Sequence, residues 1–143
     1  MIEVGIKRFD TTLPLPAYQT TGSVGIDLYA RVATVIPAKS IALVPLNVAL
    51  QLPEGTWGLL AARSSLCKKG LLLANGIGVA DYDYRGDNNE YQAVLLNVTE
   101  QDVTVDKGER IVQLIVTTYD RVAFTEKAHF TAVDRGAFGS TGS

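Results

Sequence analysis

The chain has 143 residues, is 47% hydrophobic and carries a formal net charge of −2, which indicates one domain (1–143) with a sizeable core. It contains no basic run, no stretch near the roughly 20 apolar residues of a membrane span, and no signal peptide. We therefore expect a cytoplasmic protein with no nucleic-acid and no membrane partner, and the single cysteine excludes an internal disulfide.

Short apolar runs separated by glycine and proline predict an all-β fold. Strands are expected where Val, Ile, Leu and Thr dominate, at 40–52, 56–63, 92–99 and 110–119. Only 64–70, with serines at its start and Gly70 at its end, has the caps of a short helix. We predict a jelly-roll-like β-barrel in residues 1–130, followed by a flexible glycine-rich arm, 131–143.

Two segments in the first half of the chain carry candidate functional groups. In "SVGIDLYA", Asp27 lies between apolar residues and is either a turn acid or part of a site. In "ARSSL", Arg63 is followed by Ser64 and Ser65. A guanidinium beside hydroxyls near a helix start can bind an anion, although an exposed arginine with a serine cap is the alternative.

The segment "NGIGVADYDYRG" combines glycines with acids and aromatic residues. Its glycines permit close backbone approach to a ligand. In a strand, Asp81 and Asp83 would share one face and Tyr82 and Tyr84 the other; a polar hairpin edge is the alternative.

Two further segments follow in the second half of the chain. Gln113 interrupts the apolar run "ERIVQLIV" and needs a polar partner if it is buried. In the tail, "FGSTG" places hydroxyls beside glycines, a pattern that suits phosphate binding or a disordered end.

Taken together and in this order, the segments resemble the five motifs of the trimeric dUTPase family. The matches are "SVGIDLYA", "ARSSL", "NGIGVADYDYRG", "ERIVQLI" and "RG…FGSTG", which span nearly the whole chain. The resemblance implies a jelly-roll homotrimer whose active sites combine three subunits. It also implies hydrolysis of dUTP to dUMP and pyrophosphate with Mg²⁺, in which water attacks the α-phosphorus. This reaction would remove dUTP from the nucleotide pool and supply dUMP for dTMP synthesis.

The resemblance also assigns roles to residues. It implies that Asp81 is the general base for the attacking water and that Tyr84 lies under the deoxyribose and excludes a 2′-hydroxyl. The uracil contacts carried over are the side chain of Asn75 and the backbone of Gly78, Val79 and Ala80.

The phosphate contacts implied by the resemblance are Arg63, Ser64, Ser65 and Gln113. Asp27 would touch Mg²⁺ only through water. In the tail, Phe138 would stack on uracil, and the residues expected to meet the phosphates are Arg135, Gly139, Ser140 and Thr141. Asp83 is expected to hold the hairpin, for example by pairing with Arg63 or Arg85.

The chain departs from the family pattern at three places, one of which is Ala80 in "GVAD", where Ile is more usual before the acid. "RGAFG" is two residues shorter than the usual fifth motif, which affects the assignment of Arg135. "DNNEYQAVLL" is about three residues longer than the common spacing, which leaves Gln92 as a further nucleotide contact.

Two alternatives follow from the same residues. A dCTP deaminase or a bifunctional relative would share the fold and need a glutamate, for which Glu90 is the candidate. A non-catalytic β-barrel interaction module would keep the trimer without turnover.

Overall fold

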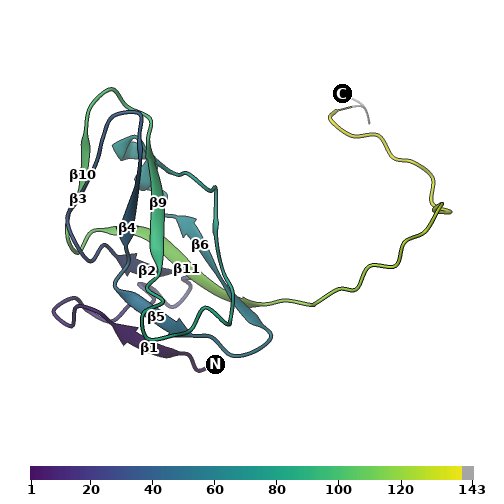
Figure 1. The fold of residues 1–143 in the computed structure, drawn as a ribbon, viewed down its shortest axis with the longest axis horizontal. Coiled ribbons are helices and arrows are strands. Elements are labelled where there is room, and N and C mark those ends of the chain that lie inside the picture. Colours follow the sequence, from purple (N-terminus) through teal and green to yellow (C-terminus); the bar gives the residue numbers. More distant parts are fainter. Residues whose placement is uncertain (140–143) are drawn as a thin grey trace.

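The structure is a computed structural model that describes residues 1–139, and within them the regular structure is almost entirely β (Figure 1). In chain order the elements are β1 (Gly5–Arg8), β2 (Ile26–Tyr29), β3 (Thr34–Ile36), β4 (Ile41–Pro45), β5 (Val48–Gln51), β6 (Thr56–Ala62), the 3₁₀ turn η1 (Leu66–Lys69), β7 (Leu71–Leu73), β8 (Gly78–Ala80), β9 (Gln92–Asn97), β10 (Val103–Val105) and β11 (Arg110–Thr118). The all-β prediction is confirmed. None of the described residues forms a helix long and apolar enough to cross a bilayer.

The short helix predicted between Ser64 and Gly70 is also confirmed, as η1. Gly70 ends it in the left-handed region with φ 73°, and its N–H donates to the carbonyl of Cys67. A side chain on Gly70 would approach Thr99 closely, so glycine is needed there both for its conformation and for space.

The apolar run 40–52 forms two strands rather than one. Asn47 separates β4 from β5 because it adopts a left-handed backbone, φ 70°. Its buried amide side chain donates to the carbonyl of Asp10 at 3.0 Å and accepts from the N–H of Asp10 at 2.6 Å. Strands β3, β7, β8 and β10 have three residues each, too few for alternation to reveal them in the sequence.

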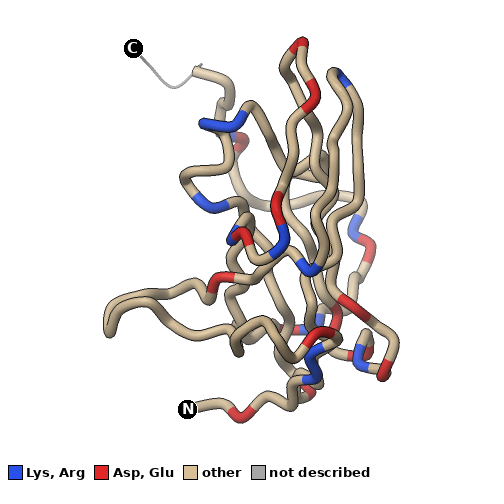
Figure 2. The backbone as a smooth tube through the Cα atoms, turned by 90° about the vertical axis from the view of Figure 1, so that its left-hand side faces the viewer, with Lys and Arg blue, Asp and Glu red and all other residues tan. Residues whose placement is uncertain are grey.

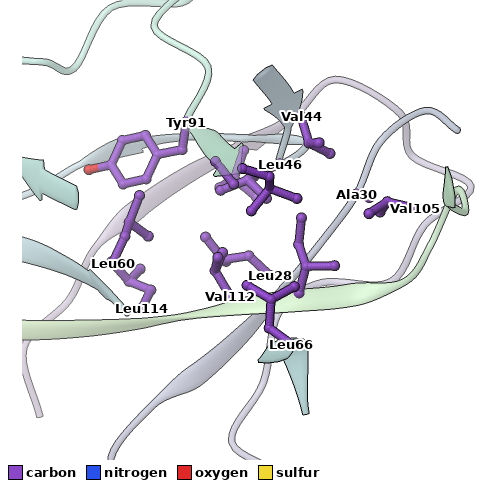
Figure 3. Close-up of a cluster of buried hydrophobic side chains, with 14 of the residues drawn as sticks. Leu28, Ala30, Val44, Leu46, Leu60, Leu66, Tyr91, Val105, Val112 and Leu114 are labelled. Carbon is purple, nitrogen blue, oxygen red and sulfur yellow. The ribbon is translucent and has the colours of Figure 1, made fainter. Parts of the chain in front are cut away.

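The strands of the described part of the chain form four antiparallel sheets. The largest has the order β2-β11-β6-β8, a second has the order β4-β9-β7, and β1-β5 and β3-β10 form two-stranded pairs. Side chains from all four sheets meet in one hydrophobic cluster, part of which Figure 3 shows around Leu28, Leu46 and Val112. Burial of this apolar surface is the main force that holds the sheets together.

An irregularity in β11 places polar groups beside one another. The register of β11 against β2 shifts between Arg110 and Val112, and both Ile111 and Val112 are buried. Past this bulge, Gln113 lies opposite Asp27 on β2 and opposite Ala61 on β6. The pairing of β2 with β11 therefore brings the first and fourth sequence motifs onto adjacent strands, and the bulge sets which of their residues lie opposite each other.

The chain beyond β11 leaves the packed body. Residues 120–139 contain no strand or helix and are exposed throughout, and Figure 1 shows them extending away from the sheets. Apolar side chains in this segment find no partner in the single chain, as Phe124 (96% exposed) and Phe130 (83%) illustrate. The boundary expected at residue 130 therefore stays a prediction about the assembled protein.

Candidate active site

A cavity of about 400 Å³ lies beside β8 at the edge of the four-stranded sheet. Many residues singled out from the sequence line it: Asn75, Gly78, Val79, Ala80, Asp81, Tyr84 and Gln92. Leu43, Leu60, Glu90 and Tyr91 complete the lining. The third motif thus forms a pocket, together with Gln92 from the start of β9.

Strand β8 offers peptide groups to this cavity because it is an edge strand. Among residues 1–139 its one pairing partner is β6, with Gly78 opposite Leu60 and Ala80 opposite Gly58. The backbone groups on its other side are therefore available to a ligand. A Cβ atom at Gly78 would lie 2.9 Å from the Cβ atom of Leu60, so the close approach of the two strands requires glycine.

A turn directly after β8 presents Asp81 and Tyr84 on the same cavity. The N–H of Tyr84 donates to the carbonyl of Asp81 at 3.2 Å, and Asp81 is exposed. The Tyr84 hydroxyl donates to the carbonyl of Glu90 at 3.2 Å. This arrangement places a carboxylate and an aromatic ring at one opening.

Tyr91 forms a buried wall of the cavity. Its ring centroid lies 6.0 Å from that of Tyr84, and Figure 3 shows it beside Leu60 at one end of the core. Its hydroxyl is buried and has no hydrogen-bond partner within the described chain. Burial, with a smaller effect from Tyr84, raises the pKa of Tyr91 to about 12.

A second cavity, of about 250 Å³, collects the anion-binding candidates. Asp27, Arg63, Ser64 and Gln113 line it, together with Gln19, Ser23, Val24 and Gly25. Gln113 donates from Nε2 to the carbonyl of Ala62 at 3.2 Å. A Cβ atom at Gly25 would come within 2.2 Å of Oε1 of Gln113, so glycine leaves the space that this side chain occupies.

Ion pairs set the charge of the second cavity. Oδ1 of Asp27 lies 2.9 Å from Nε of Arg63, and Oδ2 lies 3.2 Å from Nη1 of Arg110. Two guanidinium groups against one carboxylate leave a local positive charge, which suits an anion. Elsewhere acidic and basic residues are interspersed, as Figure 2 shows, so the positive charge at this cavity is a local feature.

These pairs correct one expectation about Asp83. It was expected to pair with Arg63 or Arg85, but Arg63 pairs with Asp27, and within residues 1–139 no ion pair of Asp83 is present. The reason is topological, because Asp27 and Arg63 lie at the same end of the sheet, whereas Asp83 follows the far edge strand β8.

The two cavities lie near opposite ends of β6. Arg63 directly follows the last residue of β6, whereas Asp81 directly follows Ala80, which pairs with Gly58 near the start of that strand. Five residues of chain separate Gly58 from Arg63, roughly 17 Å at about 3.3 Å per residue. One chain therefore does not bring Asp81 and Arg63 onto the same phosphate group.

The remaining candidates lie outside both cavities. Ser65 is the N-cap residue of η1, and its side chain makes no cap hydrogen bond. Arg135, Phe138 and Gly139 lie in the exposed C-terminal segment, where Phe138 is fully exposed. The expected contacts Ser140 and Thr141 fall outside the described residues.

Sequence reasoning missed several lining residues and partners. Gln19 and Ser23 come from a loop without a recognisable motif, and Tyr91 reads as an ordinary core aromatic. Arg110 was noticeable as a charge at the start of an apolar run, which is the signal that could have placed it beside Asp27.

Comparison with known proteins settles the family. A family model described as dUTPase matches residues 11–143. The chain belongs to the dUTPase family. It is 40% identical over 148 residues to the deoxyuridine 5′-triphosphate nucleotidohydrolase of Rickettsia prowazekii, a match that covers 99% of this chain and 98% of that protein. It is also 40% identical to the enzyme of Mesorhizobium japonicum, over 92% of this chain and 84% of that protein.

Solved structures agree with this family. The dUTPase of Streptococcus mutans superposes with a TM-score of 0.76 and 34% identity, over 84% of this chain and 99% of that chain. The dUTPase of Staphylococcus bacteriophage 80alpha, solved with dUpNHpp, superposes with a TM-score of 0.86 at 22% identity, over 99% of both chains, and shows the shared fold.

Family membership defines the activity class. The chain is a dUTP diphosphatase, a hydrolase of nucleotide metabolism. Glu90 is the candidate for a deaminase glutamate, but its carboxylate is already paired with other groups. Its Oε1 lies 2.7 Å from Nε of Arg31 and accepts a hydrogen bond from the N–H of Asn47 at 3.0 Å.

Proposed function

We propose that the chain hydrolyses dUTP to dUMP and pyrophosphate with the nucleoside in the 400 Å³ cavity and Asp81 as general base. The observation that carries this proposal is the gathering, in one cavity, of an edge strand's peptide groups, the Asp81 carboxylate and the Tyr84 ring. Each suits one part of a deoxynucleotide: the base, the attacking water and the sugar.

The carboxylate of Asp81 suits the role of base for physical reasons. An ionised carboxylate only accepts hydrogen bonds, so it holds water by the proton that must leave when oxygen attacks the α-phosphorus. Asp81 is exposed at the cavity and is free to receive a water molecule.

The edge of β8 supports selectivity for uracil. Peptide N–H and C=O groups from Gly78 to Ala80, with the Asn75 amide, can complement the two carbonyl oxygens and the N3–H of uracil. Cytosine reverses donor and acceptor at two of these points, and a site with unpaired buried groups rejects such a base by up to ~10⁴-fold. Gln92, also in the cavity lining, is a further candidate contact.

The separation of the two cavities supports a site shared between subunits of a homotrimer. Arg63, Ser64, Ser65 and Gln113 of one subunit would bind the phosphates of a nucleotide whose base and sugar lie against Asp81 of another. The exposed apolar side chains after β11 also favour assembly, because such groups are normally covered by a partner.

The C-terminal segment would close over the nucleotide in this assembly. We place Phe138 against uracil, and Arg135, Gly139, Ser140 and Thr141 near the phosphates. The full exposure of Phe138 in the single chain leaves its ring free to stack. Closure would exclude bulk water and complete the site.

The residues present suit Mg²⁺ that arrives on the triphosphate. No group of three His, Cys, Asp or Glu side chains arranged for a metal occurs in residues 1–139, and both oxygens of Asp27 are paired with arginines. Mg²⁺ keeps several waters and binds mainly to substrate phosphates, so Asp27 would contact it through water. When bound, Mg²⁺ supplies neutralising charge on the triphosphate.

The test is pyrophosphate release measured in parallel with dUTP, UTP, dCTP and dTTP. We expect turnover of dUTP alone, and in Asp81→Asn a loss of kcat of ~10³-fold with retained binding of the analogue dUpNHpp. Turnover of dUTP at the parent rate by Asp81→Asn would refute the assignment of the base.

The same assay separates the alternatives. Release of ammonia from dCTP would indicate a deaminase. Binding of dUpNHpp without any product would indicate a non-catalytic module.

The exposed thiol of Cys67 is compatible with the reducing cytoplasm, where we place the enzyme.

A further inference from the structure

The Tyr84 side chain is held by the far end of the connection between β8 and β9, in addition to the backbone bond within its own turn. Its hydroxyl donates to the main-chain carbonyl of Glu90 at 3.2 Å. The position of this carbonyl therefore affects where the Tyr84 ring stands in the cavity, and the ring is the group that would meet the sugar.

The carboxylate of Glu90 fixes its own residue in place. It receives two bonds from the guanidinium of Arg31, Nε to Oε1 at 2.7 Å and Nη2 to Oε2 at 3.1 Å. Oε1 also accepts from the N–H of Asn47 at 3.0 Å. The Glu90 side chain is only 11% exposed, so water competes weakly for these bonds.

The peptide group that contains the Glu90 carbonyl is also bonded through its N–H, which is that of Tyr91. The N–H of Tyr91 donates to the carbonyl of Val48, and the N–H of Leu46 donates to the carbonyl of Tyr91, both at 2.8 Å. The loop before Glu90, in contrast, closes on itself, with the N–H of Gly86 donating to Oδ1 of Asn89 at 2.7 Å. Glu90 is thus the point where the lengthened loop joins the rigid sheet.

We propose that Glu90, clamped by Arg31, is a positioning residue that sets the Tyr84 ring and thereby the discrimination between deoxyribose and ribose. This inference rests on the proposed function, in which Tyr84 contacts the sugar. Without the clamp the Glu90 peptide keeps only its N–H bond to Val48, so its carbonyl can tilt and the Tyr84 ring can move away from a 2′-hydroxyl. Arg31 lies outside the cavity lining, and no contact with base or phosphates is assigned to Glu90, so hydrolysis of dUTP changes much less than hydrolysis of UTP.

The experiment compares kcat/KM for dUTP and UTP in Glu90→Gln and Tyr84→Phe. A net hydrogen bond is worth up to about 1.5 kcal/mol, so we expect the dUTP/UTP ratio to fall by ~10-fold in each variant. In Glu90→Gln we expect kcat/KM for dUTP to stay within about 3-fold, because a general structural defect would lower kcat/KM for dUTP and for UTP alike. Glu100→Gln, in the exposed pair with Lys39, is the matched control and keeps the parent ratio.

A third variant separates failure of this inference from failure of the proposed function. If Tyr84→Ala keeps the parent ratio, Tyr84 does not read the sugar, and both proposals are wrong on this point. If Tyr84→Ala lowers the dUTP/UTP ratio of kcat/KM but Tyr84→Phe and Glu90→Gln leave it unchanged, only the role of Glu90 is overturned. Tyr84→Phe decides the question even if Glu90→Gln folds poorly, because it removes one hydroxyl from a side chain outside the core.

The double variant Tyr84→Phe/Glu90→Gln adds an independent check. If both residues act through the same hydrogen bond, the double variant loses no more discrimination than either single variant. Additive losses would contradict the proposed route from Glu90 to the ring.

Discussion

Asp27 and Arg63 form an ion pair that ties the first sequence motif to the second, with Oδ1 and Nε 2.9 Å apart. Arg110, at the start of β11, binds the other carboxylate oxygen at 3.2 Å. The carboxylate is 10% exposed, so it orients both guanidinium groups from within the sheet. Asp27, which was expected to contact Mg²⁺ through water, thus also orients the side chains of the two arginines.

Asp27→Asn should therefore destabilise the fold as well as impair catalysis. The substitution leaves two guanidinium groups beside a neutral amide, but they are 29% and 37% exposed and partly hydrated. We expect the free energy of unfolding to fall by about 1–2 kcal/mol, less than for a fully buried pair. Urea denaturation at pH 7 measures it. Glu100→Gln is the control, and an equally small loss in both variants, below about 0.5 kcal/mol, would contradict the prediction.

Gly25→Ala should damage the anion cavity while leaving the fold largely intact. The new Cβ atom would meet Oε1 of Gln113 at 2.2 Å, and that flexible side chain must move. We expect kcat/KM for dUTP to fall by at least ~10-fold and stability to fall by about 1 kcal/mol. Gly22→Ala is the matched control, since no atom lies within 4 Å of a Cβ atom there. Equal activity of the two variants would show that the position of Gln113 is unimportant.

Tyr91→Phe should change how stability depends on alkaline pH. The pKa of Tyr91 is raised to about 12, so the unfolded chain loses this proton first, near pH 10. The parent is therefore destabilised as the pH rises from 10 toward 12, by roughly 1 kcal/mol at pH 11 from this group alone. In Tyr91→Phe the free energy of unfolding falls less over this pH range, because the variant lacks the phenol group.

Below pH 10 the same variant should be as stable as the parent or slightly more stable, because the removed hydroxyl is buried without a partner. Urea titrations at pH 9 and pH 11 measure both effects, with Tyr82→Phe as the control for losing a phenol. A parallel pH dependence in the parent and Tyr91→Phe would disprove the prediction.

Coexpression of two inactive chains should restore activity if the active site is shared. Asp81→Asn disables the nucleoside cavity, and Arg63→Gln disables the anion cavity, which lies toward the other end of β6. Random mixing would give roughly a quarter of the sites both intact residues when these come from different subunits. Pyrophosphate release from the mixed sample measures it. If both residues came from the same subunit, no intact site would form and activity would stay at the sum of the single variants.

The amino-acid sequence by itself determined the fold class and most of the nucleoside cavity. Alternating apolar residues and glycine or proline punctuation depend on local chemistry, which is why β6, β9 and β11 were predictable. The segment from Asn75 to Tyr84 forms one pocket largely because its residues are neighbours in the chain, around a single edge strand.

Only the tertiary structure decided which distant groups meet. The pairing of Asp27 with Arg63 depends on the order β2-β11-β6, and the clamp on Glu90 depends on Arg31 and Asn47, which lie far away in sequence. The single chain also leaves the anion cavity and the nucleoside cavity near opposite ends of β6. Such relationships arise from strand pairing and from burial of a common core, and neither is encoded in the spacing of residues along one segment.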